Sequence, residues 1–242
     1  MRGSLSVRAI AALAVTPLLR LAVARYAVPA GTPNRTGCEG CGEPIRLGRA
    51  GLGPAARCPG CGARVGAPPG SVELAVLAAL AVLALADATL AERAALAWWL
   101  GWVVPLALVD LAVHRLPDRL TWPAAAGTAA LLGVAALTDS GPIPWLRALA
   151  AGIGLGLAFA ATTLLLGRRG FGLGDAKLAL SVGVLLGWYG WPVLVIGLLL
   201  TFALSAVVSL GLLLARRVSW SSHLPFGPFL ILGTCAALLL TT

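Results

Sequence analysis

The sequence Phe171-Gly172-Leu173-Gly174-Asp175-Ala176-Lys177 forms a short polar island between long apolar runs on both sides. A carboxylate in such surroundings is costly if the runs lie in a membrane, and it usually has a function there. Gly172 and Gly174 allow the backbone to approach a neighbouring segment closely or to take positive φ angles. An ordinary interpretation is also open, because an aspartate at a helix start is a good N-cap.

The composition indicates that a bilayer is the solvent for most of the chain. The sequence is 59% hydrophobic and 11% charged, with a mean hydropathy of +0.93. Such values are typical of polytopic membrane proteins rather than soluble domains. The net charge is +9, and Lys177 is the only lysine, so arginine carries nearly all of the positive charge. No basic run has interleaved aromatic residues, so we do not expect nucleic acid as a partner.

The apolar runs predict an all-α, polytopic membrane protein of about eight transmembrane helices. The runs cover residues 5–28, 72–90, 94–113, 120–137, 145–166, 176–188, 192–215 and 225–240. Arginines 8, 20 and 25 interrupt the first run, which we expect to be a retained helix with Arg20 and Arg25 reaching toward the lipid headgroups. A cleaved signal peptide is the alternative for this run.

The loops divide the chain and give it an orientation. We expect a first transmembrane helix in 1–29, a polar tetracysteine segment in 30–70 and a transmembrane domain in 71–242. Alternate loops on the side of the tetracysteine segment carry Arg35, Arg46, Arg49, Arg57, Arg64, Arg115, Arg119, Arg168, Arg169, Arg216 and Arg217. The opposite loops carry Arg93 and Arg147 and little else. The positive-inside rule therefore places the tetracysteine segment in the cytoplasm.

A second carboxylate, Asp110, lies about one and a half helical turns before the charged loop that follows its run. Alone, it reads as a helix-end aspartate near the interface. Together, Asp110 and Asp175 fall at the same membrane depth, where two close carboxyls can share one proton. The ionised partner could activate a water as general base, while the protonated partner polarises the scissile carbonyl of a peptide bond.

Three stretches carry a resemblance to a known family: DLAVHRLPDRLTWP (residues 110–123), FGLGDAKLAL (171–180) and LPFGPFLILG (224–233). In order and separation they resemble the hallmark stretches of type IV prepilin leader peptidases, the GxGD aspartic proteases of the A24 type. The resemblance implies Asp110 and Asp175 as the catalytic pair, which would make 71–242 an aspartic peptidase domain. Family members often carry a second acid two residues after the first, where this chain has Ala112.

The resemblance also implies a substrate, a location and supporting residues. The substrates would be prepilins or pseudopilins of a type IV pilus system, whose apolar N-terminal helix lies in the bilayer. The enzyme would be a multi-pass protein of the bacterial inner membrane that cleaves at the cytoplasmic face. The residues expected to support the active-site loops are Pro117, Asp118, Gly172, Gly174 and Lys177.

The supporting and histidine residues also have ordinary interpretations. Asp118 follows Pro117 and precedes Arg119, so we expect a loop or helix-cap acid that pairs with an arginine. Lys177 is expected to contact headgroups, with substrate holding or loop orientation as the alternative. His114 and His223 are expected to be interfacial and loop residues rather than catalytic groups.

Four of the five cysteines form two near-identical knuckles, Cys38-Glu39-Gly40-Cys41-Gly42 and Cys58-Pro59-Gly60-Cys61-Gly62. Four thiolates suit a tetrahedral structural Zn²⁺ in a small zinc-ribbon-like segment, with disulfides or a redox role as alternatives.

Many prepilin peptidases with a similar segment also N-methylate the new pilin terminus with S-adenosylmethionine. Here the stretch between the knuckles is shorter and lacks the usual aromatic and acidic residues. Cys235 is expected to be an apolar packing residue.

Two functions of other classes compete with the peptidase hypothesis. A non-enzymatic membrane scaffold would use the zinc ribbon to dock a pilus or secretion assembly protein, so it would need the cysteines and not the aspartates. A proton-coupled transporter would place its acids deep at mid-membrane rather than near one face.

Overall fold

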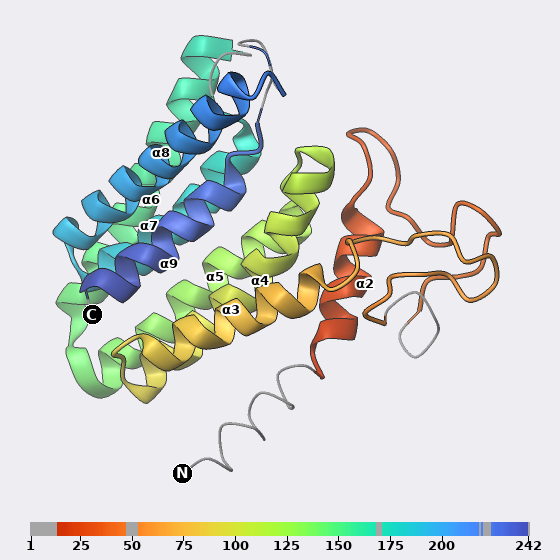
Figure 1. Ribbon diagram of the computed structural model, residues 1–242. Helices are drawn as coiled ribbons and strands as arrows, with labels where there is room; N and C mark the ends of the chain where they lie inside the picture. The colour runs from red at the N-terminus through yellow and green to blue at the C-terminus, as the bar shows by residue number, and fades with distance from the viewer. Residues whose placement is uncertain (1–13, 47–52, 168–170, 218, 220–223, 242) are drawn as a thin grey trace. The chain divides into compact units, whose positions relative to one another are not determined.

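The computed structural model describes residues 14–46, 53–167, 171–217, 219 and 224–241, and within them the chain is helical (Figure 1). The helices are α2 (Thr16–Tyr26), α3 (Ser71–Leu85), α4 (Leu90–Val113), α5 (Asp118–Ala135), the π-helical η1 (Ala136–Ser140), α6 (Pro142–Leu166), α7 (Leu173–Tyr189), α8 (Trp191–Leu214) and α9 (Gly227–Thr241). Two isolated bridges are the β-type pairings among these residues. The predicted all-α class is confirmed.

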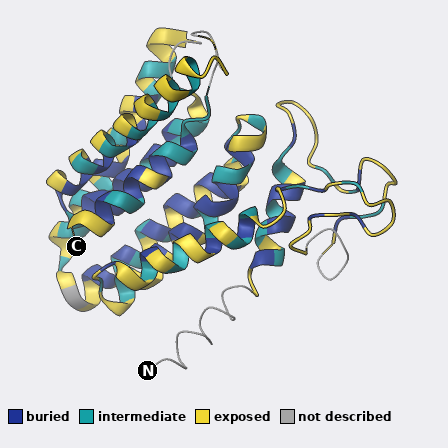
Figure 2. Ribbon diagram, in the orientation of Figure 1, coloured by how far each residue is buried: buried dark blue, intermediate teal, exposed yellow. Residues whose placement is uncertain are grey.

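Among the described residues, four helices are long and apolar enough to cross a membrane: Leu90–Val113, Asp118–Thr138, Pro142–Leu166 and Trp191–Leu214. Two shorter apolar helices, α3 and α9, have 15 residues each. The membrane architecture is therefore confirmed, whereas about eight full-length spans is a looser description. Exposed leucines run along α6 and α8 (Figure 2), among them Leu164 and Leu214. Lipid chains would solvate these side chains without the cost that water imposes.

The run predicted as a helix over residues 5–28 is described only from residue 14 onward. The described helix in this region, α2, begins at Thr16 and has 11 residues, with Pro17 in its first turn. Proline fits the start of a helix because its missing N–H would have no intrahelical partner there. Residues 1–13, which include Arg8, lie outside the described residues, so the retention of this segment stays a prediction.

The described chain packs as two compact units. One lies within Met1–Ala84 and Val104–Arg115, and the other within Leu85–Val103 and Leu116–Thr242. Helix α4 contributes its first part to the second unit and its last part to the first. These packing units do not test the predicted division at residues 29 and 70, which stays a prediction.

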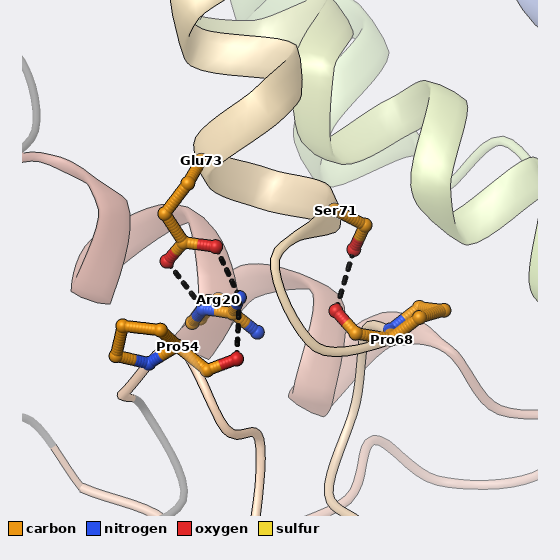
Figure 3. Close-up of polar contacts among 5 residues, drawn as sticks. All are labelled: Arg20, Pro54, Pro68, Ser71 and Glu73. Carbon is orange, nitrogen blue, oxygen red and sulfur yellow. Dashed lines mark hydrogen bonds and ion pairs between the residues drawn. The ribbon is translucent and has the colours of Figure 1, made fainter.

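In the first unit, α2 and α3 are joined by a buried ion pair (Figure 3). The guanidinium of Arg20, 2% exposed, donates to both carboxylate oxygens of Glu73, with Nε at 2.9 Å from Oε1, and also to the carbonyl of Pro54. Its Nη1 is buried without a partner. The expectation that Arg20 reaches the headgroups is therefore wrong. The pattern of charges hid this partner because Glu73 lies 53 residues further along the chain.

In the second unit, α6 to α9 lie side by side, and α7 is the most enclosed of them (Figures 1 and 2). A Cβ on Gly183 would lie 2.7 Å from the carbonyl oxygen of Ala151, so α6 and α7 approach with backbone contact. Such small-residue contacts are typical of membrane helix pairs. At the C-terminal end of α7, Arg147 Nε donates to the carbonyl of Gly187 at 2.7 Å. This arginine thereby satisfies a carbonyl that the helix end leaves open.

Candidate active site and metal centre

Asp110 is a buried carboxylate near the C-terminal end of α4. Its residue is 4% exposed, and the preceding Val109 packs with Val23, Val72 and Val76 in the core of the first unit. Helix α4 ends three residues later at Val113. A buried carboxyl group at this place is a candidate for holding and releasing a proton in catalysis.

The turn after Asp110 fixes the end of α4. His114 has a φ of +52° and its N–H donates to the carbonyl of Asp110 at 2.9 Å. Arg115 Nη1 then donates to the carbonyls of Val28 and Pro29, at 2.9 and 2.7 Å. His114 is the residue that ends α4. His223 lies outside the described residues. Arg115 therefore ties the end of α4 to the segment that follows α2.

Asp175 lies in the first turn of α7, at position N3. The N-cap is Gly172, whose N–H donates to Asp175 Oδ2 at 3.0 Å. The expectation that Asp175 itself is the N-cap is wrong, because the helix begins at Leu173. The carboxylate instead reaches back to the N-cap amide, as an acidic N3 residue does in a capping box. The carboxylate thus lies at the positive end of the dipole of α7.

The segment Leu116-Pro117-Asp118 docks on the segment around Asp175. A Cβ on Gly174 would lie 2.9 Å from the Cβ of Leu116, so only glycine allows this approach. The ammonium of Lys177 lies 2.5 Å from Asp118 Oδ1. Pro117 is the N-cap of α5, and Asp118 is the first residue of the helix. Two contacts, one steric and one ionic, therefore join the start of α5 to the start of α7.

These contacts correct one expectation. The partner of Asp118 is Lys177, not an arginine, because the fold brings the first turn of α7 to the start of α5. The expected part of Lys177 in supporting the active-site loop stays a prediction. Asp110 belongs to the first unit and Asp175 to the second, so their pairing stays a prediction.

The two cysteine knuckles have matching backbone geometry. The N–H of Gly42 donates to the carbonyl of Cys38 at 2.9 Å, and that of Gly62 to the carbonyl of Cys58 at 2.8 Å. Both glycines adopt positive φ angles, +75° and +71°, which a Cβ would strain. Cys38 and Cys58 are buried against Leu21 of α2. The tetracysteine segment thus rests on α2 and folds as two copies of one turn.

The four thiol sulfurs converge on one point. All four Sγ atoms lie within 4.8 Å of one another, and the pairs Cys38–Cys61 and Cys41–Cys58 are 3.6 Å apart. Sulfurs bound to a tetrahedral zinc at about 2.3 Å would lie roughly 3.8 Å apart. A disulfide would need about 2.05 Å, and the five cysteines are free thiols in this structure, including Cys235 in α9. The cluster could hold a zinc ion.

Backbone amides near the sulfurs act to lower the pKa of the cysteine thiols. The amide of Gly40 lowers the pKa of the Cys38 thiol to about 7. The amide of Glu43 acts to lower the pKa of Cys41, but hydrogen bonds with the sulfurs of Cys58 and Cys61, together with burial, raise it to about 12. A metal ion relieves the crowding of negative charge by binding all four thiolates. The four cysteines are therefore a donor set that could hold zinc.

Two features near the candidate site were missed from the sequence. The hydroxyl of Thr163 donates to the carbonyl of Phe171, and the Phe171 ring stacks on Phe159 with a centroid distance of 4.6 Å. Periodicity does not reveal contacts between a loop and distant helices. One signal was available, because the quoted stretches place Phe171 two residues before α7 and Phe226 directly before α9.

Comparison with known proteins places these residues in a family context. The model of the type IV leader peptidase family matches residues 94–214, a segment that contains Asp110, Asp118, Asp175 and Lys177. The chain is 36% identical over 188 residues to the prepilin leader peptidase/N-methyltransferase of Aeromonas hydrophila, which is 76% of this chain and 62% of that protein. No solved structure matches the chain.

Two further relatives share the same name over a longer match. The prepilin leader peptidase/N-methyltransferase of Burkholderia pseudomallei is 31% identical over 223 residues, 86% of this chain and 68% of that protein. The protein of that name from Pseudomonas aeruginosa is 28% identical over the same length, 71% of its own chain. The resemblance inferred from the three sequence stretches is confirmed: the chain belongs to the type IV leader peptidase family.

Proposed function

We propose that this protein is a membrane-embedded aspartic endopeptidase that removes the leader peptide of type IV prepilins or pseudopilins. One observation carries the proposal: the matched family segment contains a buried carboxylate, Asp110, and a second one, Asp175, at the N-terminus of an enclosed helix. The relatives named prepilin leader peptidase/N-methyltransferase support the substrate class.

The proposed chemistry uses Asp110 and Asp175 as a dyad that holds one proton. The ionised carboxylate takes a proton from a water, which attacks the scissile carbonyl, while the protonated one hydrogen-bonds to the carbonyl oxygen. The tetrahedral intermediate collapses when a proton passes to the leaving amine. Since the two carboxyls titrate together, neither residue is assigned the acid role in the resting enzyme.

The remaining residues of the proposed site act on the position of Asp175. Gly172 donates its N–H to the carboxylate, Gly174 brings the helix start against Leu116, and Lys177 anchors it to Asp118. The charged end of Lys177 is thereby directed to Asp118. A substrate with an apolar N-terminal helix would need few polar contacts, because the bilayer solvates most of its length.

The proposed cofactor is one structural zinc on Cys38, Cys41, Cys58 and Cys61. Zinc would fix the tetracysteine segment on α2 and takes no part in the hydrolysis. The arginine bias of the loops supports a cytoplasmic position for this segment and for cleavage, in the inner membrane of a bacterial cell. Of the loop arginines, Arg49, Arg168 and Arg169 lie outside the described residues.

The test is cleavage of a prepilin peptide by the purified protein in detergent or liposomes, with the products weighed by mass spectrometry. We expect the wild type to cleave and both Asp110→Asn and Asp175→Asn to lose at least 1,000-fold of the rate, or about 4 kcal/mol of transition-state stabilisation. Asp87→Asn, at a residue outside the family match, is the control for loss of charge. Normal cleavage by either dyad variant defeats the proposal.

The same assay with S-adenosylmethionine reports on the second activity in the relatives' name. A mass increase of about 14 Da on the new N-terminus corresponds to one added methyl group, which replaces a hydrogen on the amine. The assay also separates the proposed function from a zinc-ribbon scaffold. A scaffold loses function in cysteine variants and keeps it in aspartate variants, and it cleaves nothing.

A further inference from the structure

Four of the five phenylalanines of the chain gather at one place in the second unit. Phe159 belongs to α6 and Phe202 to α8, whereas Phe171 lies two residues before α7 and Phe226 directly precedes α9. The centroids of Phe171 and Phe226 are 4.7 Å apart, and those of Phe202 and Phe226 are 5.6 Å apart. These distances fall in the range of about 4.5–7 Å that aromatic pairs prefer. We refer to these four rings as the phenylalanine cluster.

The phenylalanine cluster holds Phe171 in place, and Phe171 begins the segment that leads to Asp175. The Phe171 ring contacts both Phe159, at 4.6 Å, and Phe226, at 4.7 Å, and those two rings are 5.9 Å apart. The backbone carbonyl of Phe171 accepts a hydrogen bond from the hydroxyl of Thr163. The next residue, Gly172, donates its N–H to Asp175 at 3.0 Å. A displacement of the Phe171 ring therefore moves the amide that holds the carboxylate.

The phenylalanine cluster lies well before the C-terminal ends of α6 and α8. Helix α6 continues from Phe159 to Leu166, which is about 10 Å further, and α8 continues from Phe202 to Leu214, about 18 Å further. The Phe171 segment contacts both helices well before they end. It is thus set into the bundle, where ring contacts and few polar contacts have to hold it.

Phe226 stands at the start of α9, between two prolines. It belongs to the sequence Pro225-Phe226-Gly227-Pro228, and its carbonyl accepts the first hydrogen bond of α9, from the N–H of Leu230 at 3.1 Å. The pyrrolidine rings fix the φ angles of Pro225 and Pro228, and Pro228 also restricts Gly227. The start of α9 therefore holds the residue that carries the Phe226 ring.

We infer that Phe226 is a positioning residue for Asp175, which acts through the ring of Phe171. The inference rests on the proposed function and gives the Pro-Phe-Gly-Pro element a role in it. Phe226 does not touch the reacting atoms in this scheme. It holds the segment from 171 to 175 in the one arrangement in which the carboxylate is presented.

The first test compares phenylalanine variants in the prepilin cleavage assay. We expect Phe226→Ala to lower kcat about tenfold, with KM changed less than twofold, because the substrate surface is intact and the carboxylate is misplaced. Phe226→Tyr keeps the ring and should keep at least half of kcat, while Phe226→Leu keeps an apolar side chain and should behave like Phe226→Ala. Phe229→Ala is the matched control, since Phe229 is the one phenylalanine outside the cluster.

A double-variant cycle tests the route through Phe171. If the two rings act as one unit, Phe171→Ala with Phe226→Ala should lose no more kcat than the worse single variant. Three outcomes would each overturn the inference. The first is a double variant whose loss of kcat is the product of the two single losses. The others are a wild-type kcat in Phe226→Leu, and equal losses of kcat in Phe226→Ala and Phe229→Ala.

Hydrogen exchange read by mass spectrometry separates this inference from the proposed function. Phe226→Ala should speed amide exchange in residues 172–177 at least fivefold, whereas Phe229→Ala should leave it within twofold of the wild type. Unchanged exchange in Phe226→Ala overturns the positioning role even if Asp175→Asn abolishes cleavage. A wild type that cleaves no prepilin defeats the proposed function, and the exchange result still decides the positioning role.

Discussion

At the scale of single residues, Gly174 shows how the lack of a side chain can be required for a contact. Its Cα faces Leu116 so closely that an added Cβ would lie 2.9 Å from the Leu116 Cβ, a short-range clash that no side-chain rotation relieves. Overpacking of this kind typically costs about 1–3 kcal/mol. The glycine thereby permits the contact that also brings Lys177 to Asp118.

We therefore expect Gly174→Ala to lower prepilin cleavage strongly and to lower the Tm of the purified protein by a few degrees. Adding Leu116→Ala should restore part of both, because it removes the side chain that the new methyl group meets. Gly154→Ala is the control, since a Cβ there would meet nothing within 4 Å. Equal behaviour of Gly174→Ala and Gly154→Ala in both assays would contradict the steric reading.

At this scale, the residue types and spacing indicated the site better than they indicated its contacts. Asp175, Gly174, Lys177 and Asp118 were all singled out from the sequence, and the structure brings the last two within 2.5 Å. The partner of Asp118 could not be predicted, because Lys177 lies 59 residues away and Arg119 was adjacent. Sequence neighbours dominate such expectations, whereas the fold decides which distant charges meet.

At the scale of elements, the apolar runs located the helices between residues 90 and 214 within a few residues. The exception is the run predicted for residues 5–28, of which the structure describes α2, from Thr16 to Tyr26. Pro17 and a turn at residues 14–15 mark the start of α2, and its buried Arg20 serves an ion pair rather than an interface. Hydropathy could not reveal that the arginine has a carboxylate partner in α3.

The Arg20–Glu73 pair gives a prediction for the joint between α2 and α3. Glu73→Gln leaves a buried cation without its counterion, which typically costs about 3–5 kcal/mol. We expect a clear loss of Tm in that variant. The double variant Arg20→Met with Glu73→Leu should recover most of the loss, because no charge is left buried.

Arg25→Met is the control for this measurement, since Arg25 is exposed on the same helix. Thermal unfolding in detergent, followed by intrinsic tryptophan fluorescence, reports on all four proteins. A Glu73→Gln variant as stable as Arg25→Met would show that the pair does not hold the two helices.

At the scale of the whole molecule, the two packing units differ in what stabilises them. The second unit buries long apolar helices against one another, whereas the segment from 30 to 70 in the first unit has few apolar side chains of its own. It is held by the cysteine knuckles and by their contact with α2. Small segments of this composition commonly fold only with their metal.

Removal of zinc should therefore affect the two units differently. We expect the purified protein to carry about one zinc per chain, measured by mass spectrometry of the metal. A strong chelator should release it and make the arginines of residues 30–70 sensitive to trypsin, while α6 to α9 stay protected in the detergent micelle. Cys38→Ser should behave like the chelated protein, and Cys235→Ser, in α9, should keep both its zinc and its protection. Trypsin resistance of residues 30–70 in the metal-free protein would mean that backbone contacts, not the metal, hold this segment on α2.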